Sequence, residues 1–576
     1  MAKSLIYVLS AWVVVAVPQA RDGNPALAQK CESIELPHFE EFDVINVHSS
    51  SVFGYSITDN PTRTASQSTI DFCHVNVSLT HSGADGIVLT SIWLPFHDWN
   101  GRFQATGGGG LAAGYFDSAL IQPVADGYAA GSTDAGLSLN NTILAGDGGW
   151  ALTPEGKLNH DLIKNFAYRS IHDMTVIGQA AIMAFYGQRP HHSYYTGCST
   201  GGRQGYLAAQ YYPEDFDGIM ANAPAIFTPR VSPGDFWPVV VMENIVAPPQ
   251  CVFSAFQAAT IRQCDRQDGA TDGLISAPDK CDFDPKTLVG QTVDCTEMSA
   301  SVVITTEHAD VAAKILEGAR TTYGDFLWFG NPPGAAFDGL ANTTVVNGTI
   351  EIVPFSSGEA WMKYFVAQDP DLNTKHISFD TFESLYFRSL FTDILGTDNP
   401  DLSDFRNAGG KLLTWHGMAD AYITHPGTTL YWDKLRKKMG GRNAVDDFYR
   451  VFLAPGVAQC RGGYGPVPSN PLAALVNWVE KGEAPDTLFA FTSSQGGGQV
   501  SRNLCHYPER LRFRGGDLND AESFICSGRS KVSQGRDKAS LEISTHYSFA
   551  YRSCDVTIPS AAMKYQGLGF KLEGFL

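Results

Sequence analysis

The sequence predicts an α/β fold in which a parallel sheet is interrupted by a large inserted region. Strand-like and helical runs alternate between about residues 87 and 225, and a further strand-like run lies at residues 411–415. The 576 residues are 44 % hydrophobic and only 18 % charged, which is enough apolar surface for a large buried core. This composition excludes a generally disordered chain.

The first part of the chain supplies the strands and helices in order. Residues 87–89 and 91–94 have the aliphatic character of strands, and residues 162–186 carry apolar side chains at helical spacing. Residues 193–196 predict a short strand, and residues 202–211 predict a helix that Pro213 ends. A strand that leads through a glycine-rich turn into a helix is typical of a parallel sheet.

The N-terminus has the pattern of a secretory signal peptide. Lys3 precedes an apolar run over residues 5–17, and small residues follow, with Ala26-Leu27-Ala28 as the expected cleavage site and Ala20 as another. A membrane anchor is the alternative, but the apolar run is too short to span a bilayer. We therefore expect a signal peptide over residues 1–28 and a secreted, extracellular protein with no membrane partner.

The cysteines and glycosylation motifs agree with export. The chain has 11 cysteines and lacks paired CxxC motifs of the zinc-binding type, so disulfides are expected and one cysteine is left over. Asn76, Asn140, Asn342 and Asn347 begin N-glycosylation motifs, which predict a glycoprotein. The net charge of −19 argues against nucleic acid as the main partner.

The composition of the chain changes in its middle part. Cys251, Cys264, Cys281 and Cys295, two glycosylation motifs and several Pro-Gly breaks fall in one stretch. We therefore predict a core in two parts, residues 29–246 and 400–576, with an inserted lid domain at residues 247–399. The second core part includes a polar C-terminal tail beyond residue 528.

Ser199 is the candidate nucleophile. Gly197-Cys198-Ser199-Thr200-Gly201 is the one match to G-x-S-x-G, and it lies between a predicted strand and a predicted helix. This context is typical of the α/β-hydrolase core, where a tight turn exposes the serine hydroxyl above the sheet. The N–H of Thr200, at the start of the helix, could stabilise an oxyanion. An ordinary glycine-rich turn is the alternative.

Asp420 is the candidate acid of a catalytic triad. It follows the predicted strand at residues 411–415 by a short turn, which places it at the strand's carboxyl end. The α/β-hydrolase chain order of Ser, then Asp or Glu, then His also fits its position after Ser199. A solvated loop aspartate is the alternative.

Several segments closely resemble the tannase and feruloyl esterase family. The resemblance implies an α/β-hydrolase core with a lid, and a carboxylic ester hydrolase acting on phenolic acid esters such as feruloyl or galloyl esters. It extends, with gaps, from about Cys31 to Cys526. Its specific hallmark is a Cys-Ser pair, here Cys198-Ser199. The segments that carry it are residues 100–110, 166–172, 195–205 and 212–219.

In the family that cysteine forms a disulfide with a cysteine next to the catalytic histidine. The resemblance therefore implies a bridge between Cys198 and Cys460, but Gln459 stands where the family has histidine. An amide cannot accept a proton near neutral pH, and loss of the triad histidine typically costs on the order of 10⁶ in kcat. A catalytically impaired family member that acts as a binding protein or decayed paralogue is therefore the alternative, and an error in the gene sequence is a weaker one.

Other histidines are candidates for a substitute base. His416 and His425 flank Asp420, and His506 follows Cys505. The remaining disulfides that we predict are Cys31–Cys73, Cys264–Cys281 and Cys505–Cys526, with Cys251–Cys295 as a looser assignment and Cys554 left over.

The segment at residues 264–275 is rich in carboxylates and glycines. Taken alone, it predicts an acidic loop with tight turns. The family resemblance implies instead a structural calcium ion, which prefers several oxygen ligands on such a loop. The implied ligands are the side chains of Asp265, Asp268 and Asp272 and the carbonyls of Ala270 and Leu274.

Aromatic residues in or near the insertion could line a phenolic pocket or serve as core packing, and the sequence leaves both open. They are Trp237, Phe326, Trp328, Trp361 and Tyr364.

Overall fold

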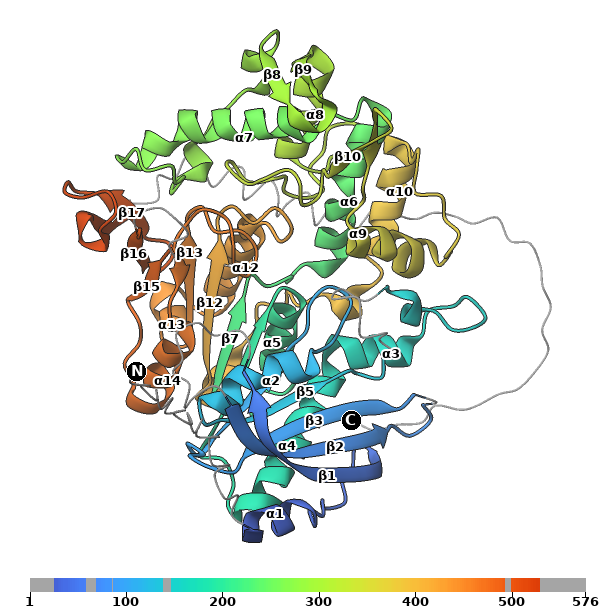
Figure 1. Ribbon diagram of the computed structural model, residues 1–576, viewed down its shortest axis with the longest axis vertical. Coiled ribbons are helices and arrows are strands. Elements are labelled where there is room, and N and C mark those ends of the chain that lie inside the picture. Colours follow the sequence, from blue (N-terminus) through green and yellow to red (C-terminus); the bar gives the residue numbers. More distant parts are fainter. Residues whose placement is uncertain (1–24, 58–68, 85, 138–146, 493–498, 529–576) are drawn as a thin grey trace, which may run out of the picture. The chain divides into compact units, whose positions relative to one another are not determined.

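A nine-stranded mixed sheet with strand order β1-β2-β3-β5-β4-β6-β7-β12-β13 organises the computed structural model (Figure 1). The structure describes residues 25–57, 69–84, 86–137, 147–492 and 499–528. Most of the predicted signal peptide, the Asn140 motif, Cys554 and the predicted tail after residue 528 lie outside the described residues. The strands of the sheet are β1 (Asp43–Ser56), β2 (Thr69–Thr80), β3 (Val88–Pro95), β4 (Arg102–Thr106), β5 (Ala129–Thr133), β6 (His192–Cys198), β7 (Gly218–Asn222), β12 (Lys411–Gly417) and β13 (Tyr449–Ala454).

The sheet has an antiparallel part and a parallel part. β1, β2, β3 and β5 pair antiparallel, whereas β5, β4, β6, β7, β12 and β13 pair parallel. Every residue of β5 is buried, and so is nearly every residue of β12, as expected for parallel strands covered on both faces. The carboxyl ends of the parallel strands meet at one edge, where their loops can bring distant residues together.

Helices cover both faces of the sheet. α4 (Ser170–Tyr186) packs at Gly178 against Phe103, and α5 (Thr200–Tyr211) packs at Gly205 against Tyr195, which points to the same face as Phe103. The side chain of Tyr194 points to the opposite face and bonds Glu480 of α14 (Pro471–Lys481). The remaining helices of the two core parts are α1 (Pro25–Cys31), α2 (Phe116–Ala125), α3 (His160–Lys164), α12 (His425–Lys438) and α13 (Arg442–Asp446).

The chain between β7 and β12 contributes no strand to the nine-stranded sheet. It forms helices and the hairpins β8–β9 and β10–β11, and it lies above the carboxyl ends of the parallel strands in Figure 1. The predicted lid boundaries, residues 247–399, fall within this segment, and by their contacts the described residues up to Ser527 form one compact unit. The elements are α6 (Thr228–Asn244), α7 (Gln250–Cys264), β8 (Thr292–Cys295), β9 (Ala300–Val303), α8 (Thr306–Glu317), β10 (Thr343–Val346), β11 (Thr349–Ile352), α9 (Ser356–Ala360), α10 (Phe379–Ser389) and α11 (Ser403–Asn407).

The last described part of the chain adds two small antiparallel sheets beside β13. One consists of β14 (Val467–Pro468), β15 (Thr487–Phe491) and β16 (Ser501–Cys505), and the other of β17 (Arg510–Phe513) and β18 (Phe524–Ser527).

The predicted fold class and strands are confirmed. The runs at residues 87–89 and 91–94 form the single strand β3, and those at residues 193–196 and 411–415 lie in β6 and β12. The predicted helix at residues 162–186 is divided into α3 and α4 by a π-helical turn, Asn165–Arg169. All the predicted disulfides are present, namely Cys31–Cys73, Cys198–Cys460, Cys251–Cys295, Cys264–Cys281 and Cys505–Cys526.

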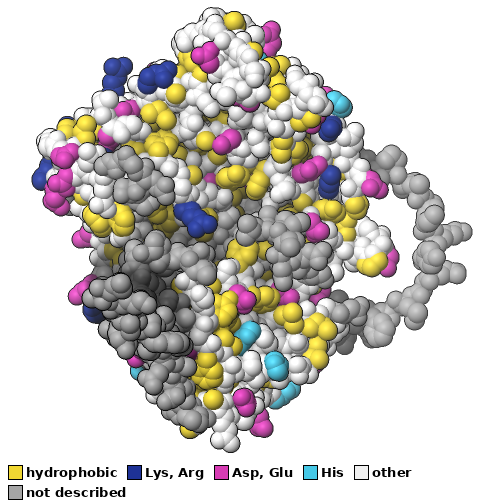
Figure 2. Space-filling model, in the orientation of Figure 1, with side chains coloured by type: hydrophobic (Ala, Val, Ile, Leu, Met, Phe, Trp, Pro, Cys, Tyr) yellow, Lys and Arg dark blue, Asp and Glu magenta, His cyan; other side chains and the backbone are white. Residues whose placement is uncertain are grey.

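Acidic residues outnumber basic ones in this chain, 60 to 41. On the face in Figure 2, the lysine and arginine side chains lie in ones and twos rather than in a continuous patch, in keeping with the net charge of −19. Among the helices in the described part of the chain, none combines the length and the apolar character needed to cross a lipid bilayer.

Candidate active site

The predicted catalytic residues follow neighbouring parallel strands at the carboxyl edge of the sheet. Ser199 comes directly after β6, Asp420 comes after β12, and Gln459 comes after β13. Because β6, β7, β12 and β13 lie side by side in this order and run parallel, the loops after them converge at the same edge. The glycine-rich segment at residues 107–110 follows β4, which pairs with β6, and it packs against the start of α5.

Ser199 occupies a strained turn between β6 and α5. Its φ and ψ angles are 63° and −119°, a conformation that non-glycine residues rarely adopt. Hydrogen bonds from the Ser199 N–H to the Asn222 carbonyl and from the Ala225 N–H to the Ser199 carbonyl hold the turn in place. This is the geometry that a nucleophile needs at the top of the sheet, because the strained turn presents its hydroxyl to the cavity.

The flanking glycines are required by close packing. A Cβ atom on Gly197 would lie 2.5 Å from the backbone carbon and oxygen of Gly201, which no real Cβ contact tolerates. The turn could therefore not close with larger side chains at residue 197. The G-x-S-x-G pattern thus has a steric cause in this structure.

Gln459 contacts the candidate nucleophile directly. Its side-chain Nε2 donates a hydrogen bond of 2.8 Å to Ser199 Oγ. The Cys198–Cys460 disulfide joins the residue before Ser199 to the residue after Gln459, across a sequence separation of 262 residues. The predicted tether between these two segments is therefore present, and an amide stands at the position of a general base.

Asp420 is fully buried and held by its own turn. Its Oδ1 accepts hydrogen bonds from the N–H groups of Tyr422 and Ile423, and its Oδ2 lies 3.2 Å from His416 Nε2. Burial raises the pKa of Asp420, while the bonds from His416 and from the backbone oppose that rise. Within the described part of the chain, Asp420 makes no hydrogen bond to Gln459.

The alternative histidines do not line the cavity at Ser199. His416 is fully buried and bonds Thr428, Asp420 and the carbonyl of Ile423. Burial lowers the pKa of His425 to about 3, so this side chain is neutral near pH 7. His506 lies 3.3 Å from Asp446, beside β13. The structure therefore brings none of these imidazoles to Ser199.

Backbone N–H groups are available for a developing oxyanion. The N–H of Thr200 is in the first turn of α5, where helical geometry leaves it without an intrahelical acceptor. The N–H of Gly108 donates to Gln204, whereas that of Gly110, which lines the same cavity as Ser199, makes no hydrogen bond in the described structure. Thr200 Oγ1 bonds the Gly110 carbonyl and fixes the two segments together.

A cavity of about 130 Å³ opens at Ser199 and is bounded by the segment between β7 and β12. We call it the Ser199 cavity. Its walls combine apolar side chains with a few polar ones. They include Leu111, Phe166, Ser199, Thr200, Arg203, Val231, Ser232, Asp235, Phe355, Ser357, Trp361, Tyr422 and Gln459.

Arg203 forms a buried wall of the Ser199 cavity. Its guanidinium donates to the carbonyls of Phe166 and Ala167 and lies 4.6 Å from the centre of the Phe166 ring. Burial lowers the pKa of Arg203 to about 10. These contacts hold the guanidinium in the wall of the cavity.

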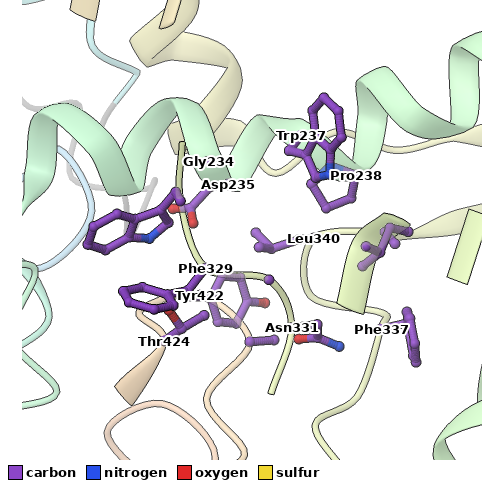
Figure 3. Close-up of a pocket in the computed structure, with 15 residues that line it drawn as sticks. Gly234, Asp235, Trp237, Pro238, Phe329, Asn331, Phe337, Leu340, Tyr422 and Thr424 are labelled. Carbon is purple, nitrogen blue, oxygen red and sulfur yellow. The ribbon is translucent and has the colours of Figure 1, made fainter. Parts of the chain in front are cut away.

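A second, smaller cavity of about 20 Å³ adjoins the Ser199 cavity and shares Asp235 and Tyr422 with it (Figure 3). We call it the aromatic cavity, because Trp237, Trp328, Phe329 and Phe337 line it. Of the aromatic residues that the sequence left open, Trp361 therefore lines the Ser199 cavity, and Trp237 and Trp328 line its neighbour.

The acidic loop after α7 gathers buried carboxylates. Asp265 and Asp268 are buried, and Oδ2 of Asp268 is a buried oxygen without a hydrogen-bond partner in the described structure. Burial raises the pKa of Asp265 and of Asp268, and the nearby Asp272 carboxylate adds to both shifts. Arg502, also buried, pairs with Asp272. The loop therefore contains more negative than positive charge, which suits a cation.

Asp265, Asp268 and Asp272 do not form a group of three with ligand atoms within 4.8 Å of one another. In the described part of the chain, the group with Cys, His, Asp or Glu ligand atoms within 4.8 Å of one another is Cys251, Cys295 and Glu297. Those two cysteines form a disulfide, so this group offers no thiolate to a metal.

Sequence reasoning missed Asp235. This aspartate lies in α6, which contains Pro233 and Pro238, and no motif surrounds it. Only the packing of α6 over the carboxyl edge of the sheet reveals that its side chain reaches both cavities.

Comparison with known proteins gives consistent matches over most of the chain. Residues 73–527 match the family model described as tannase and feruloyl esterase. A probable feruloyl esterase of Arthroderma benhamiae is 44 % identical over 506 residues, which cover 86 % of this chain and 93 % of that protein. The structure of tannin acyl hydrolase from Aspergillus niger is similar with a TM-score of 0.77 and 27 % identity, covering 88 % of this chain and 94 % of that one. Feruloyl esterase B from Aspergillus oryzae gives a TM-score of 0.73 and 28 % identity, covering 87 % and 100 %.

Proposed function

Because the chain belongs to the tannase and feruloyl esterase family, we propose that it is a secreted carboxylic ester hydrolase that cleaves phenolic acid esters. The observation that carries the proposal is Ser199, which stands in a strained turn at a partly apolar cavity with backbone N–H donors beside it. The names of the relatives, feruloyl esterase and tannin acyl hydrolase, support feruloyl or galloyl esters as the substrate class.

The reaction has two steps at Ser199. Ser199 Oγ attacks the ester carbonyl carbon, the alcohol leaves with a proton, and an acyl-enzyme remains. Water then attacks the acyl carbon, and the phenolic acid leaves while Ser199 regains its proton. In both steps the N–H groups of Thr200 and Gly110 stabilise the negative charge on the carbonyl oxygen.

Gln459 should slow this reaction, because it cannot act as a general base. Its amide donates to Ser199 Oγ and keeps the hydroxyl in place, but it has no basic lone pair to take the proton. The proton of Ser199 therefore passes to water in the cavity. We expect slow turnover compared with a triad that has histidine at this position.

A second candidate function follows from the same contact. A protein whose serine is bonded to an amide rather than an imidazole can bind phenolic esters without turning them over. The comparisons favour the esterase, since the relatives that match nearly the full chain are named as esterases.

Hydrolysis of methyl ferulate and methyl gallate by the purified protein tests both candidates. The esterase is supported if the wild-type protein releases the acid and Ser199→Ala does not. If the wild type is inactive but Gln459→His hydrolyses either ester, the scaffold is intact and the binding function stands. Equal release by wild type and Ser199→Ala would reject Ser199 as the nucleophile.

We also propose that the acidic loop holds a structural calcium ion. The side chains of Asp265, Asp268 and Asp272, with the carbonyls of Ala270 and Leu274, would be its ligands. The unpartnered buried oxygen of Asp268 and the uncompensated negative charge of the loop support this proposal. Calcium would neutralise the carboxylates and order the loop, which Cys264–Cys281 closes.

A further inference from the structure

Asp235 is a largely buried residue at the cavity wall whose carboxyl group has no partner among the described residues. It lies in α6, its exposed fraction is 7 %, and it makes no hydrogen bond or ion pair to any described residue. A polar group that is removed from bulk water and has no protein partner is unfavourable unless a ligand or water bonds it. Such a group at the wall of a cavity that contains a candidate nucleophile is suited to a ligand.

The position of Asp235 joins the two cavities. Its side chain projects from α6 toward Tyr422 in Figure 3, and both residues line the Ser199 cavity as well as the aromatic cavity. The aromatic cavity, at about 20 Å³, has room for little more than one water molecule. The Ser199 cavity, at about 130 Å³, approaches the size that accepts a benzene ring. An aromatic ring near Asp235 therefore belongs in the Ser199 cavity.

The Asp420 carboxylate is the charged group that acts on Asp235. Burial, and then repulsion from the Asp420 carboxylate, raise the pKa of Asp235 well above its ordinary value. Asp420 is the member of the pair that carries the negative charge, because backbone N–H groups and His416 bond it. Asp235 has no such donors among the described residues, so its surroundings favour the protonated form more than those of an ordinary aspartate do. A neutral carboxyl group can both donate and accept a hydrogen bond.

The surroundings of Asp235 match a hydroxylated ring. Phe166, Val231 and Trp361 supply apolar wall to the cavity. Ser357, in α9, has a buried Oγ without a hydrogen-bond partner in the described structure, and its neighbour Gly358 packs against the backbone and Cβ of Asp235. Two polar groups without partners in the described structure thus line the same largely apolar cavity.

We propose that Asp235 is a specificity-determining residue that hydrogen bonds a hydroxyl group on the aromatic ring of the acyl part of the substrate, with Ser357 beside it. The inference rests on the proposed function, because it assigns the ring end of the phenolic ester whose carbonyl reaches Ser199. It makes the ring hydroxyl, rather than the ring alone, the feature that the site selects. A site built around an unpaired polar group rejects an analogue that lacks the hydroxyl, since the group then stays unsatisfied.

The test compares methyl 4-hydroxycinnamate with methyl cinnamate, which differ only in the ring hydroxyl. We expect the wild-type protein to prefer the hydroxylated ester in kcat/KM, and Asp235→Leu to reduce that preference by about tenfold or more, mainly through KM. Asp235→Asn keeps a hydrogen-bonding group of the same shape and should retain most of the preference. Glu243→Gln is the control, because Glu243 lies in the same helix but lines neither cavity, and it should leave the preference unchanged.

Equilibrium binding separates this inference from the proposed function. In the Ser199→Ala background, calorimetry measures the affinity for 4-hydroxycinnamate and for cinnamate without turnover. We expect Asp235→Leu to weaken binding of the hydroxylated compound alone. An unchanged preference in folded Asp235→Leu, checked by thermal unfolding, overturns the inference even if esterase activity is high. Failure of the wild type to hydrolyse any ester would reject the proposed activity, and the binding comparison would still decide the role of Asp235.

Discussion

Gln459 donates a 2.8 Å hydrogen bond from its side-chain amide to Ser199 Oγ, and the Cys198–Cys460 disulfide joins the residues next to both. The geometry of a nucleophile and its base is thus complete, but the partner of the serine is an amide. Residue 459 thus has the position of a general base but not its chemistry, and each of these two points can be tested.

Gln459→His should restore a general base to Ser199. A base at this place typically contributes about 10²–10⁴-fold, so kcat for methyl ferulate should rise by at least about 10²-fold over the wild type. Gln459→Ala is the control, since it removes the amide donor and adds no base. No gain for a folded Gln459→His protein would show that residue 459 does not reach the proton of Ser199.

Removal of the tethering disulfide should cost more stability than removal of a short-range one. Cys198–Cys460 spans 262 residues and Cys505–Cys526 spans 21. Loop-entropy arguments assign about 5 kcal/mol to the first and about 3 kcal/mol to the second. Chemical unfolding of the two double Cys→Ser variants measures the difference, and an equal loss would contradict the entropic account.

Removal of calcium should destabilise the protein through the acidic loop. We expect a chelator to lower the Tm of the wild type, because a bound ion stabilises only the folded state. Asp268→Ala should have a low Tm that the chelator does not change. The exposed Asp282, close by in sequence, gives the control variant Asp282→Ala, which should respond as the wild type does. A wild-type Tm that is insensitive to the chelator would reject the calcium site.

The stability should depend on Glu480 in acid. The hydrogen bond from Arg102, followed by that from Tyr194, lowers the pKa of Glu480 from 4.5 to about 2 against the effect of burial. A depressed pKa adds stability above the unfolded-state value, and this stability is lost as the pH falls from about 4.5 to about 2.

Glu480→Gln should therefore be less stable than the wild type at pH 7, and the difference should narrow over that acid range. Thermal unfolding at a series of pH values measures it. Glu483→Gln, at an exposed residue nearby, should follow the wild-type profile. A constant difference from pH 7 to pH 2 would show that the ion pair with Arg102 is not its source.

The sequence predicted β3 and β12 from their hydrophobic runs and β6 from residues 193–196, but it did not predict β5 and β7. β3 contains Val, Leu, Ile and Trp and β12 contains Leu and Trp, whereas β5 is Ala-Ala-Gly-Ser-Thr and β7 is Gly-Ile-Met-Ala-Asn. Small residues of this kind have a weak preference for strands. They form strands here because the strands on both sides supply hydrogen bonds and the packed helices bury their side chains. Their place in the sheet is therefore a property of the assembled fold.

Much of the candidate site follows from short motifs. The G-x-S-x-G pattern located Ser199 because only glycine fits the contact between residues 197 and 201. The family resemblance also located Cys198–Cys460 and the difference at Gln459. By contrast, the partner of Asp420 depended on how its turn folds, since the carboxylate bonds His416 rather than Gln459.

The sequence by itself determined the α/β class and the candidate nucleophile, because each depends on residue types at short spacing, and its resemblance to the family implied the Cys198–Cys460 disulfide and the missing histidine. Only the tertiary structure decided which side chains share the cavity with Ser199. Asp235 is 36 residues after Ser199 in the chain and has no motif, but α6 carries it over the sheet edge. Cavity walls come from elements far apart in sequence, so their chemistry is set by packing rather than by local pattern.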